Sequence, residues 1–442
     1  MKLLLVLIFT NFLIFFVVNY LSLQRELINI DYFFCLLLIA LKLRKLAIIL
    51  FSIFFLSDLV LVSRQIFPFF RVDDILYILK FTFISSFYYK IILFSIMIYI
   101  IFISYFLYKS KRNNIQIYIV FILIIAFLVQ NIFNVVYEKN KSWLTSQVTN
   151  FIEIQTHGFS QNLRMKAQEM QNLPYSPASQ HLFSALNNQN KLNHDVLFIV
   201  NESLGVPQDQ VVLDEILSHL FKKNNFIHDL KISKTGYVGP TVYGELRELC
   251  HSQPQNFNLK DLQIGFENCL PYLFKKQGYE TKAIHGALGI MYDRKYWYPK
   301  VGFDQITFYE SRQWERQCYS FPGACDREIA QYIKNYFKDN NKFQFVYWLT
   351  LNSHSVYDER DIFYNVFDCK KFNIQSNTES CRNLRLQAQF FYVLADLIKS
   401  IQVSKLEVVI VGDHAPVILN KREQDKYFKK DDVLMINFMV YK

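Results

Sequence analysis

Five polar side chains stand where predicted β-strands end. Glu202 follows the apolar run 196–200, His285 follows 281–284, His354 follows 345–351, and Asp413 and His414 follow 406–411. Ligands of parallel α/β sheets bind outside the carboxyl ends of the strands, so we expect these side chains to share one cleft. A carboxylate and an imidazole next to each other on a tight turn can bind one divalent cation. The turn at 412–416 therefore predicts a metal site, with a purely structural Asp-His turn as the alternative.

Short apolar runs that alternate with helical stretches must position these residues. The runs are continuous, which suits strands that are buried on both faces of a sheet. We therefore predict a soluble α/β domain with a mainly parallel sheet over 194–442. Residues 137–193 are rich in Gln, Asn and Ser and predict a linker with one or two interfacial helices. The five predicted strands cover 196–200, 281–284, 345–351, 406–411 and 435–440.

Residues 1–136 have the composition of a membrane domain. A run of about 20 apolar residues can cross a bilayer as a helix, and such runs occupy 3–21, 46–63, 91–108 and 115–136. A shorter run, 27–42, carries Asp31 near one end and makes a fifth crossing. Residues 72–90 mix apolar and charged side chains and predict an interfacial or re-entrant helix. The expected anchor is a bundle of about five transmembrane helices.

Two positive clusters orient this bundle. They lie at 42–45 and 109–112, and positive loops stay in the cytoplasm. Five crossings then put the chain after about residue 137 outside the cytoplasm, so we expect a multi-pass membrane protein whose soluble half lies on the outer side. Residues 1–24 could be a cleaved signal peptide, but no small-residue cleavage site follows them. Most of the net charge of +10 lies in the apolar half, which argues against a nucleic-acid partner.

Cysteine usage also indicates that the soluble half of the chain lies outside the cytoplasm. Six of the seven cysteines lie in the soluble half, as sequence neighbours. In an oxidising compartment they suggest three local disulfides, although spacing alone does not fix the pairing and free buried thiols are the alternative. The neighbouring pairs are Cys250 with Cys269, Cys318 with Cys325, and Cys369 with Cys381.

Five sequence fragments, in this order, resemble the membrane-anchored branch of the alkaline phosphatase and sulfatase superfamily. That branch includes phosphoethanolamine transferases and phosphoglycerol transferases of the lipoteichoic-acid-synthase type. The resemblance covers about 194–440 and agrees with an anchor of five crossings. It implies a multi-pass protein of a bacterial inner membrane with a periplasmic catalytic domain. The fragments are 196–203, Gly239-Pro240-Thr241, 284–286 with 292–294, 349–354, and Gly412-Asp413-His414.

The resemblance implies a role for each matched residue. Glu202, Asp413 and His414 correspond to ligands of one divalent metal ion, Zn²⁺ or alternatively Mn²⁺, and Thr241 to a nucleophile that also touches the metal. A metal is needed because a free threonine hydroxyl is hardly ionised at neutral pH. Thr241 also precedes a predicted helix, whose amino terminus would favour a phosphate. The alternative is that Thr241 only caps this helix.

Further matched residues correspond to the phosphate and head-group pocket. Arg294 and His354 correspond to phosphate-binding residues, with His285 close by, and His354 could protonate the leaving alkoxide. Tyr292 and Trp297 could form an aromatic wall for an ethanolamine ammonium group. Ordinary core packing is the alternative for these aromatic side chains.

The resemblance predicts transfer of phosphoethanolamine from a phospholipid, phosphatidylethanolamine, to an envelope glycan or lipid such as lipopolysaccharide. The predicted intermediate is a phosphothreonine at Thr241. A phosphoglycerol transferase and a sulfatase-like hydrolase are alternatives. Ala287 counts against the first, because phosphoglycerol transferases carry an acidic residue at this position. No histidine follows in 415–442, so a second metal site is not expected. A catalytically inactive scaffold for envelope assembly is the alternative from another class.

Overall fold

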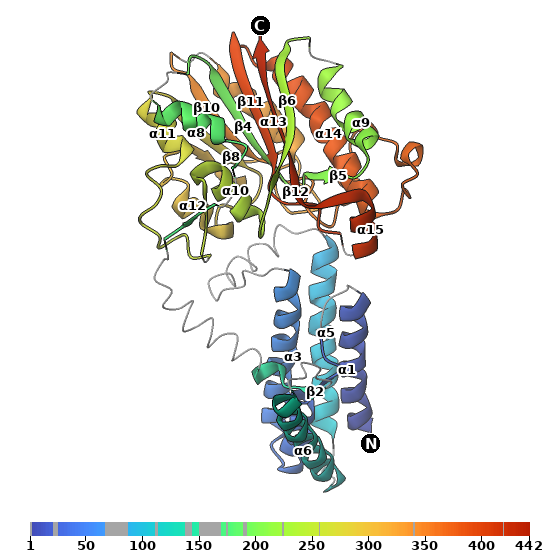
Figure 1. The fold of residues 1–442 in the computed structure, drawn as a ribbon. Helices are drawn as coiled ribbons and strands as arrows, with labels where there is room; N and C mark the ends of the chain where they lie inside the picture. Colours follow the sequence, from blue (N-terminus) through green and yellow to red (C-terminus); the bar gives the residue numbers. More distant parts are fainter. Residues whose placement is uncertain are drawn as a thin grey trace. The chain divides into compact units, whose positions relative to one another are not determined.

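The computed structural model divides into two compact units, one of residues 1–78 with 87–165 and one of 79–86 with 166–442 (Figure 1). The described residues are 2–20, 25–66, 87–110, 114–137, 144–149, 169–173, 176–188, 192–222, 225–255, 257–338, 341–418 and 420–442. Most of the predicted interfacial helix at 72–90 lies outside them.

The first unit consists of apolar helices at the predicted places. Three stretches of these helices are long and apolar enough to cross a membrane, namely Lys2–Asn19, Arg44–Val62 and Lys90–Lys109. Shorter apolar stretches lie at Asp31–Ala40 and Ile117–Gln130. The prediction of an apolar helical anchor is therefore confirmed. Its helices are α1 (Lys2–Tyr20), α2 (Asp31–Ala40), α3 (Arg44–Ile66), α5 (Phe87–Lys109) and α6 (Asn114–Tyr137).

Helix α2 is shorter than the crossing predicted at 27–42. Its ten residues extend roughly 15 Å, which is half of the hydrocarbon thickness. The residues before it form β1 (Ile28–Asn29), which pairs in parallel with β2 (Leu144–Thr145). This run is therefore not one continuous transmembrane helix, which corrects the sequence prediction at this point.

A polar network lies inside this apolar unit. Arg25 and Asp58 form a buried ion pair, with Nη2 2.8 Å from Oδ2. The Tyr32 hydroxyl and the Asn29 amide donate to the same carboxylate oxygen at 2.7 and 3.3 Å. Arg25 also donates to the side chain of Asn11, near the middle of α1. Because charges are tolerated in a membrane domain when they are paired, this network ties the non-helical segment before α2 to α1 and α3.

The second unit is built on an eight-stranded mixed sheet. Its strand order is β5-β12-β11-β4-β10-β8-β9, with β6 also paired to β12. Strands β11, β4, β10, β8 and β9 are mutually parallel, and β12 is antiparallel to its neighbours. The predicted mainly parallel α/β sheet is confirmed. The strands are β4 (Asp195–Asn201), β5 (Gly205–Pro207), β6 (Ile227–Gly236), β8 (Glu280–His285), β9 (Gln305–Thr307), β10 (Gln344–Leu349), β11 (Lys405–Gly412) and β12 (Phe428–Tyr441).

Helices cover both faces of this sheet, and Figure 1 shows α8, α10 and α11 on one side and α9 and α14 on the other. Alternate residues of β4 explain the two layers. Leu197 and Ile199 join the core cluster that includes α9, α13 and α14, whereas the Phe198 ring contacts Tyr347 on the opposite face. The helices are α8 (Gln180–Asn187), α9 (Gln210–Phe221), α10 (Thr241–Cys250), α11 (Leu270–Lys276), α12 (Arg294–Trp297), α13 (Asp326–Ile333), α14 (Glu379–Ser400) and α15 (Lys421–Tyr427).

Two features lie in the segments that lead into this domain. Helix α8 falls within the predicted linker and packs on the soluble unit, where His181 Nε2 lies 2.7 Å from Glu407 Oε1. A two-stranded antiparallel pair joins β3 (Gln171–Asn172) to β7 (Ser252–Gln253). Both contacts tie residues before 194 to the α/β domain.

Three disulfides link the neighbouring cysteines, Cys250–Cys269, Cys318–Cys325 and Cys369–Cys381. Cys35 is free and buried in the first unit. The predicted local pairing is confirmed, and disulfides of this kind are typical of an oxidising compartment.

Candidate metal centre and active site

The carboxyl ends of four adjacent strands bring the predicted site residues to one edge of the sheet. Strands β11, β4, β10 and β8 are neighbours in that order, and their carboxyl ends lie at the same level. Val411 and Leu349 are both paired with Val200, and His285 is paired with Leu349. Glu202 follows β4, and Asp413 and His414 follow β11. Residues 211 positions apart in the chain thus meet because their strands are adjacent and parallel.

Glu202, Asp413 and His414 form a compact group of potential metal ligands. Each offers one ligand atom, and these atoms all lie within 4.8 Å of one another. His414 Nε2 is 3.3 Å from Glu202 Oε1 and 3.3 Å from Asp413 Oδ2. All three residues are less than a tenth exposed. Two carboxylates and an imidazole so close together match the ligand preferences of a divalent transition metal.

Thr241 lies beside this group at the first position of α10. Its Oγ1 donates a hydrogen bond to Glu202 Oε2 at 3.3 Å, and the residue is 7% exposed. Pro240 stands before it with an extended backbone, so the helix begins at Thr241. The first backbone N–H groups of a helix lack intrahelical acceptors and favour an anion. Thr241 therefore places its hydroxyl between a carboxylate group and a helix amino terminus.

The turn that presents Glu202 is held by side chains that sequence analysis did not single out. Ser203 has a positive φ of 55°, which costs energy for a residue with a side chain. The Ser353 hydroxyl donates to the Glu202 carbonyl at 2.6 Å, and the Gln387 amide donates to the carbonyls of Glu202 and Ser203 at 3.0 and 3.1 Å. The Glu202 N–H donates to Thr350 Oγ1 at 2.9 Å. Thr350 and Ser353 belong to a matched fragment, but no sequence signal identified Gln387.

Helix α10 is also fastened to the turn that carries Asp413. Arg247, 1% exposed, donates through Nη2 to the Gly412 carbonyl at 2.5 Å and through Nη1 to the Asp413 carbonyl at 3.2 Å. Gly244 lies against the same turn, where a Cβ atom would come 2.7 Å from Asp413 Cα. Only glycine permits this approach. The helix that begins at Thr241 thus fixes its own distance from the metal-ligand group.

Arg294 is buried beside Glu245 rather than exposed to solvent. Its Nε donates to Glu245 Oε2 at 2.9 Å and its Nη2 lies 2.7 Å from the same atom, whereas Nη1 has no hydrogen-bond partner among the described residues. Tyr298 and Tyr347 donate their hydroxyls to Glu245 Oε1. Burial by itself lowers the pKa of an arginine, but the Glu245 carboxylate outweighs it and raises the pKa of Arg294. Arg294 therefore stays charged, with one nitrogen left over for an anion.

The two further histidines of the prediction occupy different environments. His285 ends β8, is 3% exposed, and its Nδ1 lies 3.1 Å from the Leu349 carbonyl. Burial, followed by the positive charge of Arg294, holds its pKa well below the usual value, so the imidazole is neutral. His354 is half-buried and its ring lies 4.6 Å from the ring of Phe321. His354 thus remains accessible, while His285 is a neutral group packed behind the site.

The predicted aromatic wall is divided between the site and the core. Tyr292 is 8% exposed, and the Arg294 guanidinium lies 4.9 Å from its ring centre. Trp297 is fully buried, donates from Nε1 to the Tyr292 carbonyl at 3.0 Å and stacks on Phe266. Trp297 therefore supports Tyr292 from the core, which favours the alternative of ordinary core packing for this residue.

The residues present fit a bound cation. Asp413 Oδ2 is buried and has no hydrogen-bond partner among the described residues. Burial, together with the neighbouring charge of Glu202, raises the pKa of Asp413 to about 7. A buried carboxylate oxygen without a hydrogen bond, beside a second carboxylate and an imidazole, is an arrangement that a bound cation stabilises. A second cluster, Cys318, Cys325 and Asp361, offers no such site because its cysteines form a disulfide.

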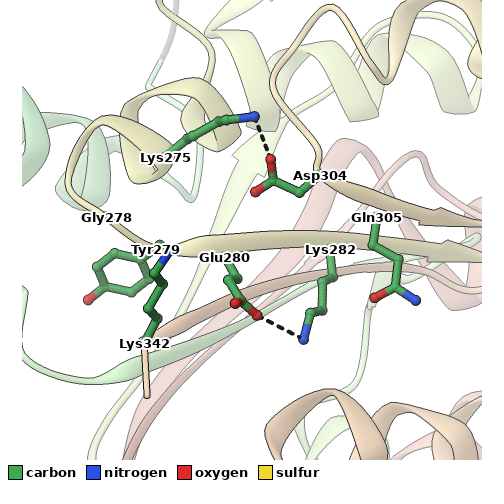
Figure 2. Close-up of a pocket in the computed structure, with 8 residues that line it drawn as sticks. All are labelled: Lys275, Gly278, Tyr279, Glu280, Lys282, Asp304, Gln305 and Lys342. Atoms are coloured by element: carbon green, nitrogen blue, oxygen red, sulfur yellow. Dashed lines mark hydrogen bonds and ion pairs between the residues drawn. The ribbon is translucent and has the colours of Figure 1, made fainter. Parts of the chain in front are cut away.

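A pocket of about 490 Å³ lies elsewhere, at the amino-terminal end of β8. Figure 2 shows Lys275 directed at Asp304 and Lys282 at Glu280, so four of its charged groups are paired with one another. The residues named above for catalysis do not line it. This pocket is separate from the candidate site, which lies at the other end of the strand.

Comparison with known proteins finds one family model and several solved structures. A family model described as Sulfatase matches residues 194–441. The lipoteichoic acid synthase LtaP from Listeria monocytogenes is 18% identical (TM-score 0.44, 55% of this chain and 65% of that chain). The Streptococcus pyogenes phosphoglycerol transferase GacH in complex with sn-glycerol-1-phosphate is 17% identical, with a TM-score of 0.41, and the match covers 62% of this chain and 77% of that chain. The C-terminal periplasmic domain of EcEptC from Escherichia coli is 11% identical, with a TM-score of 0.38, and the match covers 56% of this chain and 73% of that chain. No curated protein matches the chain.

Proposed function

Because the chain belongs to the sulfatase family of the alkaline phosphatase superfamily, we propose that it is a membrane-anchored phosphotransferase with a single metal centre. Its substrates are a phospholipid donor and an envelope glycan or glycolipid acceptor. The observation that supports this most directly is the 3.3 Å contact from Thr241 Oγ1 to Glu202 Oε2, beside Asp413 and His414. A hydroxyl in that position is available to attack a phosphodiester.

Glu202, Asp413, His414 and Thr241 would hold the metal, Zn²⁺ or alternatively Mn²⁺. When bound, the ion supplies positive charge that favours ionisation of the Thr241 hydroxyl and polarises phosphoryl oxygens. Glu202 accepts the hydrogen bond of the hydroxyl and orients its oxygen. The amino terminus of α10 and the free Nη1 of Arg294 add donors for the phosphate.

The proposed reaction has two steps. Thr241 Oγ1, already ionised, forms a bond to phosphorus, the bond from phosphorus to the lipid glycerol oxygen breaks, and diacylglycerol leaves after taking a proton from His354. An acceptor hydroxyl then gives its proton to His354 and attacks the phosphothreonine, and Thr241 leaves with its oxygen ionised again. Each step forms one P–O bond and breaks another, so no further reactant is needed.

Phosphoethanolamine from phosphatidylethanolamine is the group we propose to be transferred. Ala287 stands where phosphoglycerol transferases carry an acidic residue, and the three disulfides suit a periplasmic domain. Transfer of phosphoglycerol is the second candidate. Thr241 does not supply the Cys or Ser that sulfatases convert to their nucleophile, which disfavours sulfate-ester hydrolysis.

Mass spectrometry of envelope glycolipids, from cells with and without the protein, tests the proposal. We expect a gain of one phosphoethanolamine unit with the wild type, none with Thr241→Ala, and a partial gain with Thr241→Ser. Purified Thr241→Ala should still bind one divalent ion per chain. A gain of glycerol phosphate would select the second candidate. A metal-free wild type without any product would instead support an inactive scaffold.

A further inference from the structure

Each of three loops around the candidate site exposes a valine. Val238 is 43% exposed, Val356 47% and Val417 52%. Val238 lies three residues before Thr241, Val356 two after His354, and Val417 three after His414. Single exposed apolar side chains are ordinary on a protein surface. Here, three of the loops that carry a reacting or metal-binding group each expose a valine close to that group, whereas the apolar residues Leu204 and Val206 after Glu202 are buried.

Contacts between the three loops link the segments that carry these valines. The Tyr357 hydroxyl, next to Val356, donates to the Val417 carbonyl at 3.1 Å. The Tyr237 ring, next to Val238, lies 6.5 Å from the His414 ring. The loop of Val417 therefore contacts both of the others. We refer to Val238, Val356 and Val417 as the apolar rim.

An apolar rim suits one part of a phospholipid. The scissile phosphodiester of a donor lipid is joined directly to a glycerol that carries two acyl esters, so apolar groups lie within a few bonds of the reacting phosphorus. Removing half-exposed valines from water against such groups is favourable, by about 25 cal/mol for each Å² covered. A water-soluble phosphodiester would gain nothing from these side chains. The apolar helices of the same chain indicate that it resides where such lipids are found.

We propose that the apolar rim contacts the acylated glycerol of the donor and selects lipid over water-soluble phosphodiesters. This inference rests on the proposed function, since it concerns the donor of that same reaction. The rim binds the donor equally before and during the reaction, because the acyl esters do not change as the P–O bond breaks. Its loss should therefore raise KM and leave kcat unaltered.

The test uses the full chain in detergent micelles with two donors. Phosphatidylethanolamine carries the acyl chains, and glycerophosphoethanolamine has the same phosphodiester without them. The rim variant carries Val238→Thr, Val356→Thr and Val417→Thr, because threonine keeps the shape and β-branching of valine and adds a hydroxyl. The matched control is Val211→Thr, a 61% exposed position on α9. Thermal unfolding and metal content check that the variants are folded.

We expect the rim variant to raise KM for phosphatidylethanolamine roughly tenfold at unchanged kcat. Its kcat/KM for glycerophosphoethanolamine, where the wild type uses that donor, should stay within about twofold, and Val211→Thr should match the wild type. Unchanged kinetics with phosphatidylethanolamine, an equal loss with both donors, or a fall in kcat would overturn the inference. If the triple variant does not fold, Val417→Thr alone should show a smaller rise in KM. A wild type that transfers phosphoethanolamine from neither donor would instead refute the proposed function.

Discussion

Glu245 Oε2 accepts a hydrogen bond from Arg294 Nε at 2.9 Å and lies 2.7 Å from Nη2, with both side chains at most 1% exposed. Glu245 is one helical turn beyond Thr241 on α10. The same helix therefore positions the candidate nucleophile and the guanidinium beside it. A fixed spacing between a nucleophile and a cation is what positioned phosphoryl transfer requires.

Glu245→Ala should lower the free energy of unfolding by about 3–5 kcal/mol, because it leaves a buried guanidinium without its counter-charge. Thermal unfolding of the full chain measures this. Asp432→Ala, which breaks the exposed Lys234–Asp432 ion pair, is the control and should cost at most about 1 kcal/mol. The double variant Glu245→Ala with Arg294→Met should be more stable than Glu245→Ala alone. Equal costs for the two single variants would contradict the structural role of Glu245.

Gly244→Ala should weaken metal binding. A methyl group at this position would meet Asp413 Cα at 2.7 Å and Cβ at 2.8 Å, so α10 or the ligand turn must move. Overpacking costs about 1–3 kcal/mol and exceeds the gain of about 1 kcal/mol from helix propensity. Calorimetric titration with Zn²⁺ should show about tenfold weaker binding.

Gly278→Ala is the matched control for this variant. No atom lies within 4 Å of a Cβ there, but its φ of +88° is unfavourable for alanine. It should lose stability through the backbone alone and bind Zn²⁺ like the wild type. Equal Zn²⁺ affinities for Gly244→Ala and the wild type would show that α10 does not set the position of Asp413.

Gln387→Ala should lower metal affinity about 10-fold to 100-fold without removing a ligand. Its amide donates to the carbonyls of Glu202 and Ser203, and the latter residue holds a positive φ. Gln389→Ala, on the same helix, is the control because Gln389 binds Asp361 and Phe363 instead. Metal content after dialysis against graded chelator separates the two variants. If both lose metal alike, the effect is general destabilisation of α14.

His285→Asn should remove part of the pH dependence of stability. The pKa of His285 is held well below its unfolded value of about 6.5, so below that pH the unfolded state binds a proton that the folded state does not. Stability contributed by the neutral imidazole is therefore present above pH 6.5 and is lost as the pH falls, by about 1.4 kcal/mol per unit. Asparagine never titrates and can replace the hydrogen bond from Nδ1 to Leu349.

Thermal midpoints of the wild type and His285→Asn, measured at pH 7.5 and pH 5.5, test this prediction. The wild type should lose more stability than the variant between the two values. The other titrating groups of the site are present in both proteins, so they cancel in the comparison. Parallel pH profiles would show that the folded state takes up a proton at His285 in this range.

Local chemistry in the sequence was sufficient for five of the eight strands of the main sheet, namely β4, β8, β10, β11 and β12, and for the polar groups that follow the first four of these, but it did not predict β5, β6 or β9. Continuous apolar runs such as 196–200 are buried on both faces wherever they lie in the sheet, so they predicted β4. The Asp413-His414 turn and the local disulfides were also readable, because their partners are close in sequence. Apolar runs near 20 residues gave the helical anchor, since length and composition decide membrane crossing.

Only the tertiary structure decided which residues meet. Glu202 contacts Asp413 because β4 and β11 are adjacent and parallel, and nothing in either segment specifies that neighbour. The same holds for Gln387 beneath Glu202, for Glu245 beside Arg294, and for the burial of Trp297. Hydrophobic periodicity records whether a side chain is buried, whereas the identity of its neighbours depends on how segments hundreds of residues apart pack together.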